Sequence, residues 1–124
     1  MRIIKFRAWD GDNWVYSSSI KYDERSRNWM IYDLSKSDWV YCSIPKQYTG
    51  VDDRYGIEIY EDDIVKGKYW DYGKERRFIG QIQFLETAFK IVGVKQYKGM
   101  RQELNRFYEI IGNIYESPEL KEEN

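Results

Sequence analysis

The chain of 124 residues has no histidine and only one cysteine, Cys42. Without imidazole, neither a Ser-His nor a Cys-His nucleophilic pair is available, and no metal site can draw on histidine. One thiol cannot form a metal-binding cysteine cluster or an intramolecular disulfide, so cysteine usage gives no indication of secretion. We therefore expect a protein that is not an enzyme, with no catalytic residues, no metal site and no cofactor.

The chain also lacks long apolar runs and a strong charge of either sign. No segment is apolar enough for a signal peptide or a membrane span, so we expect a cytoplasmic protein with no membrane partner. The net charge of −1 removes any whole-protein argument for nucleic-acid binding. The charges are unevenly spread, however. Residues 47–65 carry one arginine against six acidic residues, a net −5, and residues 66–106 carry ten basic against four acidic residues, a net +6.

Aromatic residues are in excess, at 18% of the chain with 12 tyrosines and 5 tryptophans. In the first part of the chain they alternate so densely that both faces of a sheet would carry rings. One face can pack in the core, and the other favours self-association, because Tyr and Trp are enriched at interfaces. An overcrowded core is the alternative. The rings concerned are Trp9, Trp14, Tyr16, Tyr22, Trp29, Tyr32, Trp39 and Tyr41.

Turn residues divide residues 1–46 into short strands. The segments 2–9 and 14–16 flank Asp10-Gly11, which predicts a β-hairpin. A second hairpin is predicted over residues 20–34 around the polar segment DERSRN, and a fifth strand over residues 39–43 ends before Pro45. We interpret residues 1–46 as an aromatic-rich N-terminal β subdomain.

Residues 47–124 are interpreted as a barrel-like C-terminal β subdomain with an acidic tail. Turns are predicted at Thr49-Gly50 and at residues 52–56, where Gly56 would supply a positive φ. Strands are predicted at residues 57–60, 64–70, 78–85, 89–94 and 110–115, and Gly93 indicates a bulge or a close backbone approach.

These strands predict a mainly β fold. The favoured architecture is an SH3-like small barrel of five strands over residues 60–116, with the N-terminal hairpins packed against it as a sheet. At most one short helix is expected, near residues 100–107, because Met100, Leu104 and Phe107 have helical spacing. A single mixed sheet with one helix is the alternative.

Four segments have the order and spacing of a known family: IIKFRAWD near the start, QYTGVDDRYGIEIYEDDIV in the middle, GQIQF after it, and YEIIGNIYESPEL near the end. In these segments the chain resembles the YopX family of phage and prophage proteins. The resemblance implies a mainly β fold and a mobile-element origin in a bacterial host cell, and it implies no established catalytic residues. Where such proteins usually have glycine before the aspartate of the central motif, this chain has Asp62. The matching positions are Phe6, Arg7, Ala8, Trp9, Tyr48, Thr49, Gly50, Asp52, Gly56, Ile59, Tyr60, Glu61, Asp63, Ile64, Val65, Ile111, Gly112, Asn113, Ile114, Tyr115 and Pro118.

Carboxylates remain as candidates for chemistry. Glu58, Glu61, Asp62 and Asp63 could hold Mg²⁺ or Ca²⁺ through oxygen ligands. On a strand, Asp62 and Asp63 point to opposite faces, so we favour a solvated acidic edge that faces the basic residues 66–106. The segment DGDN at residues 10–13 resembles the start of a calcium loop but lacks the later ligand and glycine, and no glycine motif that cradles phosphate is present.

The most suggestive surface is the predicted hairpin over residues 66–77, KGKYWDYGKERR. It interleaves cations with aromatic rings, as single-strand-binding proteins do when cations follow phosphates and rings stack on bases. The alternative is an exposed, charge-protected hairpin with Trp70 buried in the core. The candidate binding residues are Lys68, Tyr69, Trp70, Tyr72, Lys74, Arg76 and Arg77.

Three functions stay open. The favoured one is a homo-oligomeric phage or prophage accessory protein that acts by binding, to a host or phage protein or to single-stranded nucleic acid, rather than by catalysis. The second is an oligomer that captures a small charged ligand, or blocks a host defence factor, at a subunit boundary. The third is a Mg²⁺-dependent enzyme built on Glu58, Glu61 and Asp63.

Overall fold

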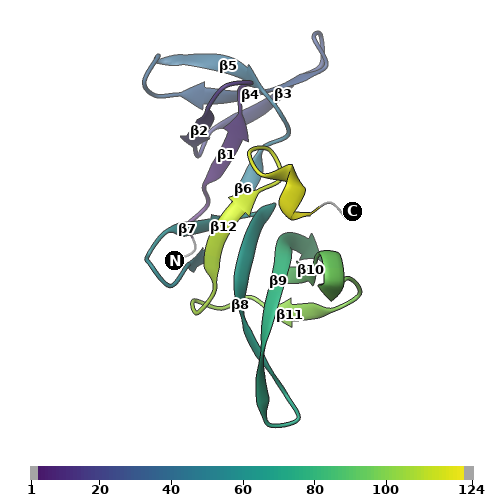
Figure 1. Cartoon of the computed structure of the whole chain (residues 1–124). Helices are drawn as coiled ribbons and strands as arrows, with labels where there is room; N and C mark the ends of the chain where they lie inside the picture. Colours follow the sequence, from purple (N-terminus) through teal and green to yellow (C-terminus); the bar gives the residue numbers. More distant parts are fainter. Residues whose placement is uncertain (1–2, 122–124) are drawn as a thin grey trace. The chain divides into compact units, whose positions relative to one another are not determined.

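The structure is a computed structural model that describes residues 3–121; residues 1–2 and 122–124, which include the end of the acidic tail, lie outside it. The chain forms two compact units, Met1–Gly50 and Val51–Asn124. Both are built from antiparallel strands, and no α-helix occurs among residues 3–121. The predicted mainly β fold is confirmed (Figure 1).

The first unit begins with the hairpin of strands β1, Phe6–Trp9, and β2, Trp14–Ser17. Its turn is held by Asp10, whose Oδ1 accepts hydrogen bonds from the backbone N–H groups of Asp12 at 2.9 Å and Asn13 at 2.8 Å. These hydrogen bonds, the one from Asn13 first, hold the pKa of Asp10 below its usual value, because they stabilise the charged carboxylate. The hairpin predicted at Asp10-Gly11 is confirmed.

A three-stranded meander follows, in the order β3-β4-β5, with bounds Ile20–Asp23, Asn28–Asp33 and Asp38–Cys42. Strand β6, Lys46–Asp52, then pairs with β1. The core of this unit forms around Ala8, Val15 and Ile31.

Aromatic rings of the first unit pair directly across strands. Trp9 meets Trp14 and Tyr22 meets Trp29, each with ring centroids 5.3 Å apart in edge-to-face contact. In each pair the two residues lie opposite each other in the strand register. Such pairs contribute roughly 0.5–1.5 kcal/mol beyond the area they bury. Part of the aromatic excess therefore stabilises strand pairing within the unit.

The second unit contains a five-stranded sheet in the order β11-β10-β9-β8-β12. Its strands β11 and β12 are edges that do not pair with each other within residues 51–121, so the sheet is open and does not close into a barrel. The SH3-like barrel predicted over residues 60–116 is not confirmed. The bounds are β7 Glu58–Tyr60, β8 Asp63–Asp71, β9 Lys74–Leu85, β10 Ala88–Gly93, β11 Arg101–Glu103 and β12 Glu109–Asn113.

The core of the second unit lies on one face of this sheet. It is built from the buried side chains of Ile59, Val65, Phe78, Ile82, Ile91 and Tyr108. Burial raises the pKa of the Tyr108 hydroxyl above its usual value. The Tyr108 ring lies against Gly67 of β8 so closely that a Cβ at position 67 would overlap it. Only glycine lets β8 pass beneath this ring.

The hairpin of β8 and β9 projects beyond the rest of the sheet (Figure 1). Strand β10 pairs with residues 80–85 of β9, and β12 pairs with residues 63–66 of β8. The residues between these points form strand pairs only across the hairpin itself. The outer edges of this part of the hairpin therefore have no neighbouring strand within residues 51–121.

Two local predictions are wrong. Residues 101–103 form strand β11 rather than helix, and Met100 and Leu104 pack on the core while Phe107 is 72% exposed, so their helical spacing does not mark one face. Thr49-Gly50 is no turn but part of β6, in which Gly50 adopts a φ of +87°. The turn over residues 52–56 is confirmed, with Gly56 at a φ of +81°.

Candidate functional site

A cleft of about 1040 Å³ lies in the second unit beside the β8–β9 hairpin. Its walls come from that hairpin, from the turn after β6 and from the segment between β11 and β12. Five of its lining residues are basic, three acidic and two aromatic. The lining residues are Asp53, Arg54, Lys66, Gly67, Lys68, Trp70, Glu75, Arg77, Asn105, Arg106, Phe107 and Glu109.

Side chains of strand β8 point alternately into the cleft and toward the core. Lys66, Lys68 and Trp70 are exposed at every second position, because successive side chains of a strand point to opposite faces. Tyr69 points the other way and packs edge-to-face on Phe78, with centroids 5.9 Å apart. The same alternation that buries Tyr69 thus gives the cleft its cations and its tryptophan.

The five cations of the cleft fall into two groups. Lys66 forms an ion pair with Glu109 and Lys68 with Glu75, both at 3.4 Å. No described carboxylate forms an ion pair with any of the remaining three, Arg54, Arg77 and Arg106. A guanidinium group that is not ion-paired to a carboxylate of the protein can bind the phosphate or carboxylate of a ligand through paired, charge-assisted hydrogen bonds.

The arginines without carboxylate partners are held by other contacts. Arg77 Nε donates a hydrogen bond to the Tyr97 hydroxyl at 3.0 Å. The guanidinium of Arg106 lies 5.7 Å from the centroid of the Phe107 ring. These neutral partners orient the two guanidinium groups without neutralising them, which leaves the positive charge available to an anion.

Two aromatic rings stand open at the same cleft. Trp70 is 70% exposed and Phe107 is 72% exposed. The alternative prediction, in which Trp70 is buried in the core, is therefore wrong. Large exposed rings beside unpaired guanidinium groups provide flat surfaces on which a planar, apolar ligand group can stack.

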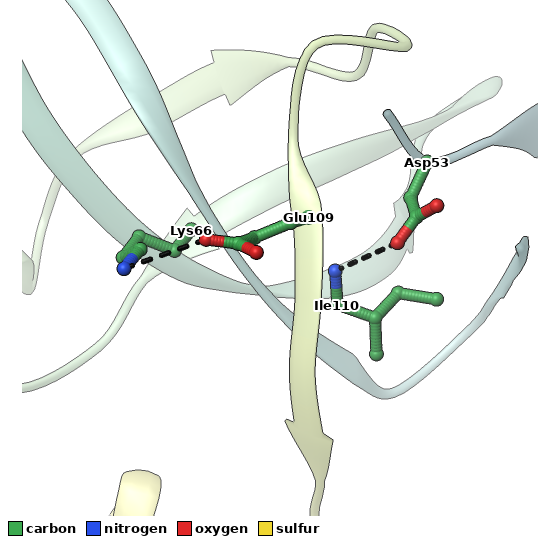
Figure 2. A network of polar contacts seen from close by, with 4 residues as sticks. All are labelled: Asp53, Lys66, Glu109 and Ile110. Carbon is green, nitrogen blue, oxygen red and sulfur yellow. Dashed lines mark hydrogen bonds and ion pairs between the residues drawn. The ribbon is translucent and has the colours of Figure 1, made fainter. Parts of the chain in front are cut away.

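Asp53 links two walls of the cleft. Its side chain is only 5% exposed, and Oδ1 accepts hydrogen bonds from the backbone N–H groups of Tyr55 at 2.8 Å and Ile57 at 2.9 Å. Oδ2 accepts the N–H of Ile110 in β12 at 3.2 Å, as Figure 2 shows beside the Lys66–Glu109 ion pair. The carboxylate is thereby occupied by three backbone donors.

The structure divides the candidate binding residues of the hairpin. Lys68, Trp70 and Arg77 line the cleft, whereas Tyr69 faces the core. Arg76 forms an ion pair with Asp71 at 2.7 Å and lies outside the cleft. The cleft lining likewise excludes Lys74 and the fully exposed Tyr72 of the hairpin tip.

The segment before β12 was missed as a contributor to the cleft. Asn105, Arg106 and Phe107 were interpreted as the end of a helix, although Asn105 is a frequent turn residue. Its Oδ1 accepts the N–H of Phe107 at 2.8 Å and closes such a turn. The basic-aromatic dipeptides Arg106-Phe107 and Arg54-Tyr55 have the composition of the hairpin, and this signal could have identified both.

Several positions of the family resemblance have structural roles. Tyr60 and Asp63 are almost fully buried, and the Asp63 carboxylate accepts the Tyr60 N–H at 2.8 Å. Asn113 Oδ1 accepts the N–H groups of Tyr115 and Glu116 at 3.0 and 2.9 Å and so forms the turn after β12. These side chains satisfy backbone donors inside the fold.

Two further positions of the family resemblance, Gly112 and Asp62, matter for the backbone conformation. A Cβ at Gly112 would lie 2.7 Å from Leu120 Cδ1 and 2.8 Å from Ser117 Oγ, closer than real Cβ contacts. Asp62 adopts a φ of +72°, so the tight turn that usually has glycine is retained with aspartate, whose Oδ1 accepts Gln81 Nε2 at 2.8 Å. Among residues other than glycine, aspartate and asparagine tolerate this region best.

Other positions of the resemblance lie in strand β6 or in turns. Tyr48 is 8% exposed, and its N–H donates to the Lys5 carbonyl at 2.8 Å. Thr49 and Gly50 follow it in β6, Asp52 at the end of this strand is exposed, and Glu61 lies in the turn before β8.

Two general features bear on partners. Among residues 3–121, no three histidine, cysteine, aspartate or glutamate side chains are grouped so that they could hold a metal ion. Within the same residues, no helix has the length and apolar character needed to span a membrane.

The comparisons with known proteins agree with this fold. The crystal structure of protein EF1440 from Enterococcus faecalis superposes with a TM-score of 0.55 over 98% of this chain and 100% of that one, at 22% sequence identity, which shows a shared fold. No curated protein matches the chain. The family described as YopX protein matches residues 5–122, nearly the whole length. The chain therefore belongs to the YopX family.

Proposed function

We propose that the protein binds single-stranded nucleic acid in the cleft of its second unit. The observation that supports this proposal is the presence in one cleft of Arg54, Arg77 and Arg106, none of which has a described ion-pair partner, together with two exposed rings. Proteins that bind single strands combine a basic groove along the phosphates with aromatic side chains on which bases stack.

The geometry favours a single strand over a duplex. Trp70 and Phe107 need an open base face, which a stacked duplex does not offer. The cleft volume of about 1040 Å³ lies just above the range of roughly 300–1,000 Å³ for small-ligand pockets, so it suits a few nucleotides. The net charge of the lining, five cations against three carboxylates, favours a polyanion.

Binding without catalysis is part of the proposal. The carboxylates of Glu75 and Glu109 are held in ion pairs with lysines, and Asp53 accepts three backbone donors. A general base needs a carboxylate free to accept a proton from the substrate. In this proposal the cleft therefore binds the phosphates and bases of a single strand and leaves the strand chemically unchanged.

The proposal is tested with a fluorescently labelled oligothymidylate of about ten nucleotides, titrated with protein at low salt while anisotropy is recorded. Trp70→Ala and Phe107→Ala should each weaken binding about tenfold, because stacking on one ring contributes roughly 1–3 kcal/mol per base. Tyr72→Ala is the matched control, since Tyr72 is also an exposed ring but lies outside the cleft. No binding by the unmodified protein, or an equal loss in all three variants, would contradict the proposal.

Related properties stay predictions. A phage or prophage origin follows from the family resemblance, and self-association from the exposed rings Tyr16, Tyr22 and Tyr41 of the first unit, which are 48–56% exposed. A cytoplasmic location in a bacterial host is also predicted. Size-exclusion chromatography with light scattering measures the oligomeric state directly.

A further inference from the structure

We propose that Asp53 is a positioning residue of the cleft, which holds the turn carrying Arg54 against the segment carrying Arg106 and Phe107. This inference rests on the proposed function, because those residues are its nucleic-acid contacts. Asp53 itself would not touch the ligand.

The first half of this arrangement is the turn that follows β6. Asp53 Oδ1 accepts the N–H groups of Tyr55 and Ile57, the Asp53 N–H donates to the Ile57 carbonyl at 2.7 Å, and the Gly56 N–H donates to the Asp53 carbonyl at 2.9 Å. Four hydrogen bonds thus involve one residue within a five-residue turn. They fix the backbone from which the Arg54 side chain extends, and so lower the entropy that binding would otherwise cost.

The second half joins this turn to β12. Asp53 Oδ2 accepts the Ile110 N–H at 3.2 Å, and the Arg54 N–H donates to the Tyr108 carbonyl at 2.9 Å (Figure 2 shows the first of these). Because β12 is an edge of its sheet, its outward N–H groups have no neighbouring strand to pair with. Asp53 supplies the missing acceptor, and in doing so it anchors the chain directly after Arg106, Phe107 and Tyr108.

Burial makes this contact hard to replace. The Asp53 side chain is 5% exposed, so loss of its charge would leave backbone donors in a position that water reaches poorly. An asparagine of the same shape keeps one oxygen for the turn but places an N–H₂ group against Ile110. The turn would survive, while the side-chain hydrogen bond that joins it to Ile110 of β12 would be lost.

The inference is tested by binding of the same labelled oligothymidylate to Asp53→Asn and to Asp52→Asn. Asp53→Asn should weaken binding about tenfold, the loss of roughly one charge-assisted contact. Asp52→Asn is the matched control, because it removes the same charge from the adjacent, exposed residue, and it should bind like the unmodified protein. If both variants bind alike, Asp53 has no positioning role.

A double-mutant cycle separates positioning from general stability. In an Arg54→Ala/Arg106→Ala background, Asp53→Asn should weaken binding much less than in the unmodified protein, because two of the three groups that it positions are absent and only Phe107 remains. A full tenfold loss in that background would overturn the inference. If Asp53→Asn does not fold, Asp53→Ser takes its place in both experiments, since its hydroxyl can still accept within the turn but is too short to reach Ile110.

The inference can also be tested without a ligand, so that its failure is distinguishable from failure of the proposed function. Amide relaxation measured by NMR should show increased motion at Arg54 and Arg106 in Asp53→Asn, and unchanged motion in β9 and β10. Equal relaxation at both arginines in the two proteins would refute a positioning role, whether or not the oligonucleotide binds. Absence of binding to the unmodified protein would refute only the proposed function.

Discussion

The three arginines without ion-pair partners predict how nucleic-acid binding depends on salt. We assume that Arg54, Arg77 and Arg106 each neutralise one phosphate. Each contact with a single strand contributes about −0.7 to the slope of the logarithm of the association constant against the logarithm of the salt concentration, so the three together should give a slope of about −2. An increase of about fourfold in salt should then weaken binding about 18-fold. In Arg77→Ala/Arg106→Ala one contact remains, so the slope should be about −0.7 and the same increase should weaken binding only about 2.6-fold.

The assay is fluorescence anisotropy of the labelled oligothymidylate at several salt concentrations. The matched control is Lys74→Ala/Arg76→Ala, which removes the same charge from the same hairpin but outside the cleft. All four positions are exposed, so neither variant should unfold the protein. If the control lowers the slope as much as the cleft variant does, the contact is made by diffuse charge and the cleft assignment is wrong.

Three further predictions concern stability and reactivity. Gly67→Ala should lower the free energy of unfolding by roughly 1–3 kcal/mol, because its Cβ would overlap the Tyr108 ring, and urea denaturation measures this; an unchanged midpoint would refute the contact. The pKa of Asp10 is lowered in the folded state, so the stability that its carboxylate contributes is complete above its unfolded pKa and is lost as the pH falls through the folded value. Thermal melts between about pH 5 and about pH 2 should therefore show a smaller decline of the melting temperature for Asp10→Ala than for the unmodified protein. Burial, and then the charge of Asp10, raises the pKa of Cys42 to about 11. The thiol of the native protein should therefore react with a disulfide reagent far more slowly near neutral pH than the same thiol in the urea-unfolded chain, and equal rates would contradict its burial.

The sequence predicted those parts of the fold that depend on neighbouring residues. The hairpin at Asp10 forms because one carboxylate accepts the N–H groups of the next residues along the chain, a pattern visible in the sequence itself. The turn at Gly56 was predicted for the same reason. By contrast, the short edge strand Arg101–Glu103 depends on pairing with β10, and its flanking apolar residues at helical spacing indicated a helix instead.

The cleft could be predicted only in part, because it combines distant segments. The cations and the tryptophan of β8 and β9 were identified from their interleaved pattern, but the pattern could not show that Tyr69 faces the core. Arg54 and Arg106 lie 52 positions apart by their numbers and come together through hydrogen bonds such as that between Asp53 and Ile110, whose sequence separation is 57. Contacts at that separation leave no local pattern to recognise.

The most direct test of single-strand binding by the cleft is an NMR titration of the ¹⁵N-labelled protein with oligothymidylate. We expect saturable shifts of the Trp70 indole N–H and of the backbone amides of Arg54, Lys68 and Phe107, with little change in the first unit. Shifts confined to Met1–Gly50, or no shifts with excess oligonucleotide at low salt, would contradict it.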